Sequence, residues 1–405
     1  MDFQHSPRAL EYLGKVSELI EKRIRPSEAT YFEQLTGSND LRQWRIPKVM
    51  DELKAEAKAA GLWNLFLPDK RWGAGLDNRD YAPIAELMGA SFIAPEVFNC
   101  NAPDTGNMEV LVHYGSPEQQ ERWLKPLLDG AIRSGFAMTE PDVASSDATN
   151  MQARAEVRGD EIVINGRKWW TTGAGDPRCK FVIFMGVTDP DAQRHARHSM
   201  VLVPLDSKGV TIERMLPVFG HLDEPNGHAQ LKFEDVRLPL SAMIAGPGRG
   251  FEIAQGRLGP GRIHHCMRCI GAAERALQRL CERAVSRVAF GKPIVNLGGN
   301  REIIANCRMA IDQARLLTLQ AAYLLDTQGI AGAISAVSQI KVIAPNVLQM
   351  VVDAAIQIHG GAGMADLELN RLLAMARSLR IADGPDEVHR GVVARLELAK
   401  YNMQR

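Results

Sequence analysis

The first third of the chain has apolar residues at helical spacing. From Leu10 to Ile24 they recur at steps of three and four, which places them on one face of a helix. A second helical stretch runs from Pro47 to Ala60. Pro117, followed by the acidic Glu118, is typical of a helix start. The pattern predicts an N-terminal helical domain over residues 1–134.

From residue 135 the pattern changes to short runs of β-branched and aromatic residues. Turn signals such as Arg158-Gly159-Asp160 and Asn165-Gly166 separate these runs. The spacing predicts a central β-domain over residues 135–245, built as a sandwich or a small barrel. The predicted strands cover residues 136–139, 153–157, 161–165, 168–172, 180–187, 200–204, 210–215 and 228–233.

After the glycine-rich loop at 246–250 the pattern is helical again. Gly or Pro interrupts it, which predicts separate long helices over 251–286, 301–328, 332–358 and 385–400. We therefore expect a C-terminal helical domain over residues 246–405 and an α+β fold in the order helices, strands, helices. A length of 405 residues agrees with several subdomains, because one core rarely grows that large.

Composition and charge narrow the classes of function. The 48 basic and 48 acidic side chains cancel, and no clustered basic stripe suggests a nucleic-acid partner. No apolar run approaches the roughly 20 residues of a membrane span, so no membrane insertion is expected. The first residues, which include Asp2 and Glu11, show neither the basic start nor the apolar core of a signal peptide. A cytoplasmic location is the expectation.

The six cysteines are scattered along the chain, which is typical of reduced intracellular thiols. Cys266 and Cys269 form one CxxC pair, and His265 lies one helical turn from Cys269. A four-ligand zinc site needs further partners at suitable spacing, and none is evident in the sequence. We interpret the pair as helix packing and expect no metal.

Two segments of the β-domain carry candidate chemistry. Phe136 to Asp147 is a strand that runs into a polar turn, whose Ser and Asp side chains can hydrogen-bond the backbone. In the next segment, alternate side chains face opposite sides, so one of Trp169 and Trp170 enters a core. The other indole, with a Thr two residues later, forms a flat apolar wall. Such a wall suits a planar heterocycle, although a cross-strand aromatic pair also explains it.

Together with three later motifs, these segments resemble the acyl-CoA dehydrogenase family over essentially the whole chain. The later motifs are RVAFGKP at 287–293, QIHGGAG at 357–363 and IADGPDEVHR at 381–390. The resemblance is closest to a subgroup whose larger members fuse the dehydrogenase to an aminoglycoside-phosphotransferase-like kinase, a domain that this chain is expected to lack. It implies an FAD-dependent α,β-dehydrogenation of an acyl-CoA thioester, and a C-terminal four-helix bundle.

The resemblance also implies that FAD lies between the β-domain and the bundle. Trp170 would cover a face of the flavin and Thr172 would hydrogen-bond near its N5 atom. The guanidinium of Arg287 suits the pyrophosphate, although a surface salt bridge is its alternative role. The full set of implied cofactor residues is Phe136, Met138, Thr139, Ser145, Trp170, Thr172, Arg287, Phe290, Gln357, His359, Gly360, Gly361, Pro385 and Glu387.

The segment from Gln357 to Gly361 matches a loop that contacts the FAD of a neighbouring subunit, so the resemblance implies a homodimer or homotetramer. It further implies an acyl-CoA substrate and an electron-transfer flavoprotein as acceptor. The implied substrate residues are Ser146, Arg262 and Gly384. Ala382 stands where a Tyr often lies beside the base, which would leave a roomier pocket.

The matched position of the catalytic base is Asp383. The family removes the α-proton with a carboxylate while the β-hydride passes to flavin N5, and the common base is a Glu followed by Gly-Thr. A second lineage places a Glu on the helix after the β-domain, where this chain has Gly261. Composition alone makes Asp383-Gly384-Pro385 a helix entry, and only the matched position favours a base.

Other functions stay open at this point. A flavin oxidase on the same fold, for acyl-CoA or nitroalkanes, would differ in its reaction with oxygen. An enzyme of 4-hydroxyacyl-CoA breakdown and a non-catalytic helical scaffold are further alternatives. The length and branching of the acyl group are not determined by the sequence.

Overall fold

A computed structural model describes residues 4–401, apart from the side chains of residues 258–260. The contacts divide the chain into two units, which we describe separately. The helical unit comprises Met1–Pro26, Gly75–Pro95 and Gly259–Arg405, and the β unit comprises Ser27–Ala74 and Glu96–Leu258. The domain boundaries predicted from the sequence, at residues 134 and 245, divide the chain into three consecutive segments and not into these two units. They stay a prediction. Residues 1–3, on which the targeting expectation partly rests, lie outside the described residues.

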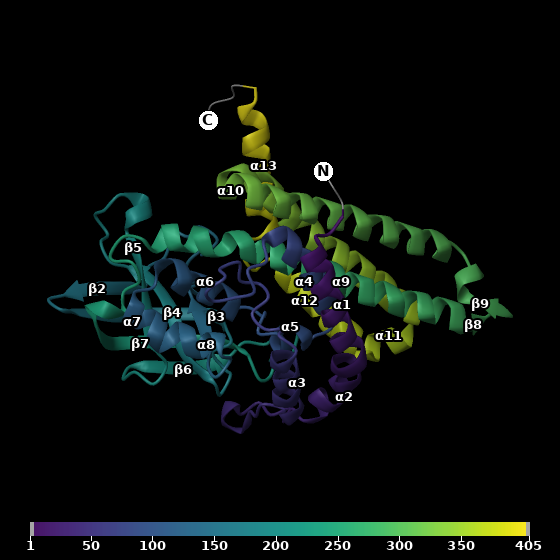
Figure 1. Ribbon diagram of the computed structural model, residues 1–405, viewed down its shortest axis with the longest axis horizontal. Coiled ribbons are helices and arrows are strands. Elements are labelled where there is room, and N and C mark those ends of the chain that lie inside the picture. Colours follow the sequence, from purple (N-terminus) through teal and green to yellow (C-terminus); the bar gives the residue numbers. More distant parts are fainter. Residues whose placement is uncertain (1–3, 402–405) are drawn as a thin grey trace. The chain divides into compact units, whose positions relative to one another are not determined.

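The β unit is built on one seven-stranded sheet (Figure 1). Its strand order is β1-β4-β2-β3-β7-β6, with β5 pairing on β4. The β1–β4 pair is parallel, whereas β3 pairs antiparallel with both β2 and β7. The strands are β1 Arg133–Ala137, β2 Arg154–Arg158, β3 Glu161–Thr172, β4 Cys179–Val187, β5 His198–Pro204, β6 Val210–Met215 and β7 His228–Pro239.

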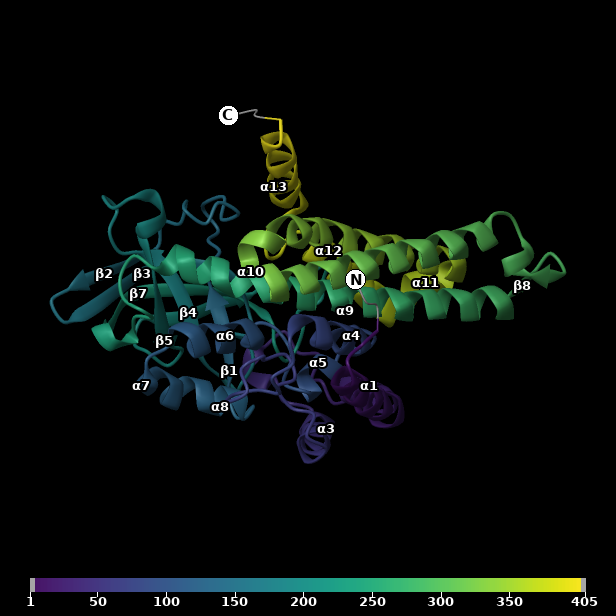
Figure 2. The same ribbon diagram turned by 45° about the horizontal axis from the view of Figure 1, so that its top comes forward.

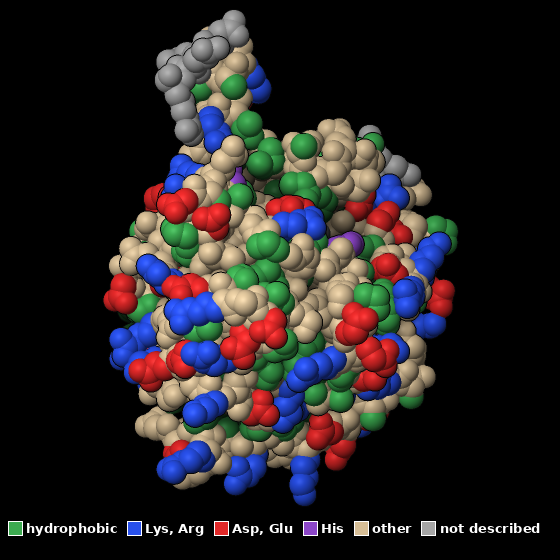
Figure 3. All heavy atoms as spheres, turned by 90° about the vertical axis from the view of Figure 1, so that its left-hand side faces the viewer, with side chains coloured by type: hydrophobic (Ala, Val, Ile, Leu, Met, Phe, Trp, Pro, Cys, Tyr) green, Lys and Arg blue, Asp and Glu red, His purple; other side chains and the backbone are tan. Residues whose placement is uncertain are grey.

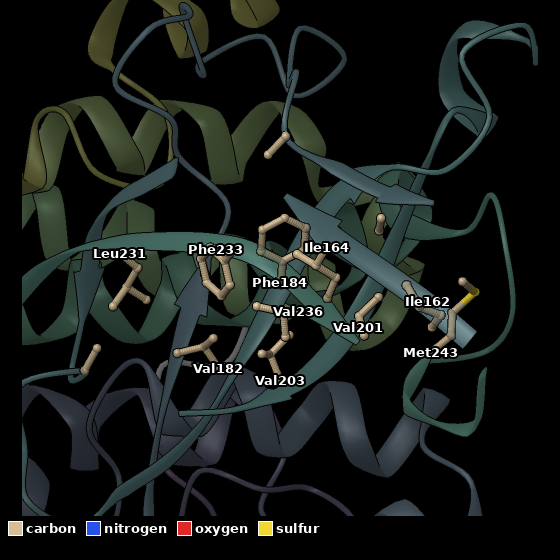
Figure 4. Close-up of a cluster of buried hydrophobic side chains, with 14 of the residues drawn as sticks. Ile162, Ile164, Val182, Phe184, Val201, Val203, Leu231, Phe233, Val236 and Met243 are labelled. Carbon is tan, nitrogen blue, oxygen red and sulfur yellow. The ribbon is translucent and has the colours of Figure 1, made fainter. Parts of the chain in front are cut away.

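Alternating residues of these strands form the core of the β unit. In Figure 4 the side chain of Ile164 lies beside that of Phe184, and Ile162 lies beside Met243 at one end of the same cluster. Side chains of this cluster follow the period of two of a strand, but the central strands are buried on their other face as well, since Val163, Ile183 and Met185 are also fully buried. The rings of Phe184 and Phe233 pack edge to face with centroids 4.9 Å apart. The two rings therefore join β4 to β7 within this core.

The predicted turn at Asn165-Gly166 is wrong, because β3 runs through it without a break. The register with β7 shifts between Ile164 and Gly166, which marks a bulge. Gly166 has a φ of 145°, and a Cβ there would lie 2.5 Å from the Cβ of Ala153. The glycine thus permits a close approach between neighbouring segments rather than a reversal of the chain.

The helices of the β unit precede its strands. α3 starts after Pro47, as predicted, and α7 starts at Pro117, where Ser116 and Gln119 form a capping box. Two of the points at which the sequence passes from one unit to the other fall within α2 and α5. The bounds are α2 Arg25–Glu33, α3 Lys48–Ala59, α5 Ala94–Val97, α6 Asp104–Tyr114, α7 Pro117–Gln119 and α8 Lys125–Leu128, with short π- or 3-10-helical turns at Leu41–Gln43, Gln120–Leu124, Arg194–Ala196 and Leu240–Ala242.

The helical unit is dominated by α9, α10 and α12. Gly329 interrupts α10 with non-helical backbone angles, so this element consists of two helices, as the sequence predicts. The two parts of α10 run beside α9 and α12 as a bundle (Figures 1 and 2). The bounds are α1 Pro7–Leu19, followed by a π-turn Ile20–Ile24, then α4 Asn78–Gly89, α9 Gly250–Ser286, β8 Val288–Ala289, β9 Lys292–Pro293, a 3-10 turn Ile294–Asn296, α10 Asn300–His359, α11 Gly361–Ala365, α12 Leu367–Leu379 and α13 Asp386–Ala399.

By length and composition alone, α10 could cross a membrane. The expectation from the sequence did not include this apolar stretch. An 18-residue window in it has a mean hydropathy of 1.3, and 44% of that window is buried. The core helix of a bundle passes the same test, since it is apolar on the faces that pack. The break at Gly329 and the packing on α12 and α13 agree with such a core role.

Charged side chains of both signs are mixed on the face shown in Figure 3. Lys and Arg side chains alternate there with Asp and Glu, as the balanced composition leads one to expect. A mixed surface of this kind creates little long-range attraction for a polyanion.

Candidate active site

The wall of the predicted flavin site lies on a bulge of β3. Lys168 pairs with Leu231 and Thr171 with Ala229, so Trp169 and Trp170 together face a single residue of β7. The bulge overturns the expected alternation: Lys168 and Thr171 are fully buried, while Trp170 is 41% exposed. Neither indole belongs to the buried core. Trp170 has a φ of 53°, a left-handed conformation that is strained for a bulky residue.

A buried ion pair lies beneath this wall. The ammonium group of Lys168 donates to Glu140 Oε1 at 2.7 Å and to the carbonyl of Met138 at 2.8 Å. The Glu140 carboxylate also accepts from the backbone N–H groups of Gln152 and Ala153. Burial lowers the pKa of Lys168 to about 8, although the Glu140 carboxylate favours its charged form. The pair thereby ties the segment after β1 to β3.

The segment after β1 contains four further predicted cofactor and substrate residues. The carbonyl of Thr139 accepts from the N–H of Trp169 at 2.9 Å, so this strand continuation lies against the wall. The hydroxyl of Ser145 accepts from the N–H of Glu140 at 2.8 Å, and it therefore braces its own loop. Ser146 is exposed and Met138 is half-buried.

The ring of Phe136, on β1, makes a cation–π contact. The guanidinium carbon of Arg257 lies 4.0 Å from the ring centroid. Arg257 also donates to Asn107 Oδ1 at 3.2 Å and to the carbonyl of Pro103 at 3.3 Å. Burial raises the pKa of Glu109, on the same helix as Asn107, to about 8, and Arg257 opposes that shift.

Thr172 is the first member of a hydrogen-bonded chain. Its Oγ1 lies 2.9 Å from Nδ1 of His228, the residue directly opposite it on β7. His228 Nε2 in turn lies 2.9 Å from Asp223 Oδ2. The ring of Trp170 packs beside that imidazole, with centroids 5.7 Å apart. The sequence did not predict His228 or Asp223, because their relation to Thr172 depends on strand register.

In the helical unit, the predicted base Asp383 lies in the turn between α12 and α13. Its φ is 55°, again left-handed. Two side chains donate to its backbone carbonyl: Arg262 Nε at 3.3 Å, and His389 Nε2 at 3.2 Å. Arg262 comes from α9 and His389 from α13. Helices distant in sequence therefore fix the position of this one peptide group.

The carboxylate of Asp383 faces a histidine. His265 Nε2 lies 3.4 Å from Asp383 Oδ2, and its Nδ1 lies 3.2 Å from Nη2 of Arg268. A guanidinium can only donate, so Nδ1 accepts and the ring proton is on Nε2, directed at the carboxylate. The sequence singled out His265 for its spacing to Cys269, and the structure gives it this different position. Both cysteines of the CxxC pair are buried, which raises the pKa of each thiol.

The next residue, Gly384, completes the turn. Its carbonyl accepts from Lys341 Nζ at 3.2 Å, and burial lowers the pKa of that lysine. Gly384 has a φ of 101°, and a Cβ there would lie 2.8 Å from His389 Nε2. Burial, with help from Arg262, lowers the pKa of His389 to about 4, so its ring is neutral at physiological pH. The turn thus requires glycine for conformation and for space.

Pro385 and Glu387 lie at the start of α13. The sequence predicts Pro385 as the first helical residue, but the structure makes it the N-cap, and α13 begins one residue later at Asp386. Asp386, which follows it, is buried and accepts from Arg380 Nε at 2.9 Å and Asn346 Nδ2 at 3.0 Å. Glu387 is exposed. Asp386 therefore anchors the helix, whereas Glu387 is free of a buried structural role.

The remaining predicted cofactor residues lie at two exposed places. Arg287 precedes the β8–β9 hairpin, and Phe290 lies at its tip, 94% exposed, with a φ of 49°. Gln357, Gly360 and Gly361 are exposed where α10 ends. His359 donates from Nδ1 to the carbonyl of Ala355 at 2.7 Å. The structure therefore places Asp383, Gly384, Pro385 and Arg262 at one turn of the helical unit. Arg287, Phe290 and the residues at the end of α10 lie in separate segments of that unit.

Family models match almost the whole chain. The N-terminal, middle and C-terminal domain models of acyl-CoA dehydrogenases match residues 10–131, 135–236 and 248–398. The chain belongs to the acyl-CoA dehydrogenase family. The predicted resemblance and the predicted α+β fold are therefore both confirmed.

Among its acyl-CoA dehydrogenase relatives, "Acyl-CoA dehydrogenase family member 11" of Gallus gallus is 53% identical over 400 residues. The alignment covers 98% of this chain but only 51% of that relative, so the chain spans about half its length. "Probable acyl-CoA dehydrogenase FadE2" of Mycobacterium tuberculosis is 50% identical over 404 residues, 99% of this chain and 98% of that one. A solved chain of a proposed acyl-CoA dehydrogenase from Mycobacterium abscessus is 63% identical, with a TM-score of 0.95, and the match covers 98% and 100% of the two chains.

The prediction of FAD as cofactor is confirmed at the level of the acyl-CoA dehydrogenase family. A glutaryl-CoA dehydrogenase from Mycobacterium smegmatis, solved in complex with FADH2, shares the fold with a TM-score of 0.79 at 22% identity, over 96% and 94% of the chains. The residues of this chain fit such a group. The β unit presents an exposed indole at Trp170 with the hydroxyl of Thr172 two residues away, which suits a planar heterocycle with a polar edge.

Proposed function

We propose that this chain is an FAD-dependent acyl-CoA dehydrogenase in which Asp383 removes the α-proton of an acyl-CoA thioester. The observation that carries the proposal is the construction of the Asp383 turn. Two donors hold the carbonyl of Asp383, and the Nε2–H of His265 faces its carboxylate. A residue that only starts a helix needs no such support, and Asp386 already anchors α13.

The role of each group follows from its chemistry. The thioester α-proton is weakly acidic, so the carboxylate must be placed within hydrogen-bonding reach of it. Asp383 is one methylene shorter than the Glu of the common family pattern. Its left-handed backbone, fixed by Arg262 and His389, is the means by which this chain sets the reach of the shorter carboxylate. His265 orients the carboxylate by donating to Oδ2.

In the β unit, Trp170 would stack on the flavin and Thr172 would lie at its N5 edge, with Phe136, Met138, Thr139 and Ser145 along it. When bound, FAD supplies the acceptor for the β-hydride and its two electrons. Arg287 offers an always-charged, forked donor for the pyrophosphate. We propose noncovalent binding, since the proposed contacts need no covalent link.

We also propose a homodimer or homotetramer with shared cofactor sites. Phe290 is almost fully exposed at the tip of a hairpin, and Arg287 stands beside it. A large aromatic side chain presented in this way is typical of a contact with another chain. The exposed end of α10 at Gln357 to Gly361 would serve the same contact. Light scattering should give at least twice the monomer mass, and an FAD-saturated monomer would contradict the shared site.

We further propose an electron-transfer flavoprotein as acceptor, as the family resemblance implies, and a cytoplasmic location. An oxidase on the same fold and an enzyme of 4-hydroxyacyl-CoA breakdown are the rival assignments. The residues Ser146, Arg262 and Gly384 would lie on the substrate side, and Ala382 next to the base leaves room for a substituted acyl group.

The proposal is tested by mixing the purified yellow protein with a panel of acyl-CoA thioesters without oxygen. A dehydrogenase loses its flavin absorbance with at least one thioester and recovers it slowly when air is admitted. Rapid recovery in air would favour an oxidase instead. A protein that cannot be loaded with FAD, or a loaded protein that no acyl-CoA or hydroxyacyl-CoA bleaches, would overturn the assignment.

A further inference from the structure

The chain Thr172–His228–Asp223 has a defined direction of hydrogen bonds. The Asp223 carboxylate accepts, so His228 Nε2 carries the proton of that 2.9 Å contact. On the neutral ring, Nδ1 then has a lone pair and no proton. In this tautomer the Thr172 hydroxyl, 2.9 Å away, donates its single proton to Nδ1. On the side away from His228, the Thr172 hydroxyl can therefore only accept hydrogen bonds.

The surroundings of the chain hold this arrangement in place. Thr172 and His228 are directly paired residues of β3 and β7, so strand register sets their distance. Asp223 lies in a loop that closes on itself, since its carbonyl accepts from the N–H of Gly227 at 2.9 Å. The His228 side chain is 15% exposed, with the indole of Trp170 beside it, whereas the Asp223 side chain is 55% exposed.

We propose that His228 and Asp223 fix the Thr172 hydroxyl as a hydrogen-bond acceptor toward the flavin, and thereby stabilise the reduced cofactor relative to the oxidised one. The proposal rests on the proposed function, because it requires Thr172 at the N5 edge. The two histidine contacts make His228 a positioning residue, which acts on the cofactor through Thr172 and does not itself react.

The consequence follows from the hydrogen bonding of the flavin nitrogen N5. In oxidised flavin N5 has a lone pair and accepts, whereas in reduced flavin it carries a proton and donates. A hydroxyl whose proton is committed to His228 matches the second state and opposes the first. An acceptor that matches only one state of a group shifts its equilibrium toward that state. The hydrogen bonds from Thr172 through His228 to Asp223 therefore raise the midpoint potential of the bound flavin, which favours oxidation of the acyl-CoA.

The test is the midpoint potential of the FAD-loaded protein, measured with a reference dye. His228→Leu removes the acceptor and frees the Thr172 proton for oxidised N5. At a fixed potential we expect the ratio of reduced to oxidised flavin to fall about tenfold, equivalent to about 30 mV for a two-electron couple. His228→Asn keeps an acceptor near the place of Nδ1 and should recover most of the shift. His221→Leu, in the same loop, is the matched control and should change nothing.

A double-mutant cycle with Thr172→Val isolates the route through the hydroxyl. In the Thr172→Val background, His228→Leu should leave the potential unchanged, because no proton remains to redirect. An unshifted potential in His228→Leu, or an equal shift in both backgrounds, would overturn the inference. Neither result touches the proposed function, whose own test is the bleaching of the parental protein by acyl-CoA. Flavin retention in each variant is read from its absorbance before titration.

Discussion

The two candidate parts of the site are built in different ways. On β3, the side chains of Trp170 and Thr172 are placed by a bulge and by polar side chains directly behind the strand. In the turn before α13, the position of Asp383 depends on donors that reach its backbone from α9 and α13. The wall is therefore a local construction within one sheet, whereas the turn depends on helices far apart in sequence.

This difference determines what a substitution should do. A substitution of Lys168 or Glu140 removes the buried ion pair beneath the wall and should affect both the stability of the protein and its retention of flavin. Damage at the turn should move one carboxylate while leaving the helices intact, because Asp386 holds α13 independently. The following variants test this separation between the wall and the turn.

Lys168→Met should have the largest effect on stability. It leaves the Glu140 carboxylate buried without its ammonium partner, which typically costs about 3–5 kcal/mol. The free energy of unfolding from urea titration should fall by that amount, and flavin retention should fall with it. The matched control is Arg167→Met, since Arg167 pairs with Glu213 at the exposed surface, where such pairs contribute about 0–1 kcal/mol. Equal losses in the two variants would show that the buried pair does not support the wall.

Glu109→Gln tests, by its pH dependence, the buried acid that faces Arg257, the residue whose guanidinium lies over Phe136. Burial raises the pKa of Glu109 to about 8, from an unfolded value near 4.5. Its contribution to stability is complete below pH 4.5 and is lost as pH rises through 8, because the folded protein must then ionise a buried acid. The variant should therefore match the parent at pH 4–5 and exceed it at pH 9 by roughly 2–3 kcal/mol, since each pKa unit is worth about 1.4 kcal/mol and the site relaxes. Thermal unfolding at both pH values measures this, and parallel pH profiles would exclude a buried, ionising Glu109.

Gly384→Ala should have a smaller effect on stability, confined to the turn. A Cβ at this left-handed position would meet His389 Nε2 at 2.8 Å, and backbone strain of this kind costs about 1–3 kcal/mol. We expect the rate of flavin reduction by acyl-CoA to fall while FAD content stays at the parental level. Gly391→Ala is the control on α13, where the added methyl meets open space and a helix interior favours Ala. Loss of FAD in Gly384→Ala would indicate that the turn and the wall are not separate.

The sequence predicted the helices and most strands because their periodicity is a local property. It missed the bulge at Trp169 and Trp170, since one extra residue on β3 changes which side chains are buried without changing the composition. Lys168 and Glu140 lie 28 positions apart, and no spacing rule relates them. The same holds for Thr172 and His228, whose pairing follows from register.

The Asp383 turn shows the reverse case. Its residues were found by position within a family motif, and the local composition indicated only a helix entry. The physical support for Asp383 comes from Arg262 and His265, which only the folded bundle brings to the turn, and from His389, six positions along the chain. His265 had a sequence signal, but that signal was its spacing to a cysteine and concerned a metal.

The role of Asp383 as the base that removes the α-proton can be measured in the Asp383→Asn variant. This substitution keeps the size of the side chain and removes its basicity. Parental and variant proteins, both loaded with FAD, are mixed without oxygen with an acyl-CoA that bleaches the parent, and the loss of flavin absorbance is followed by stopped flow. A base role for Asp383 predicts parental FAD content, retained acyl-CoA binding and a rate lowered by roughly 10²–10⁴-fold, as is typical for the loss of a general base. Bleaching of the variant at the parental rate would contradict it.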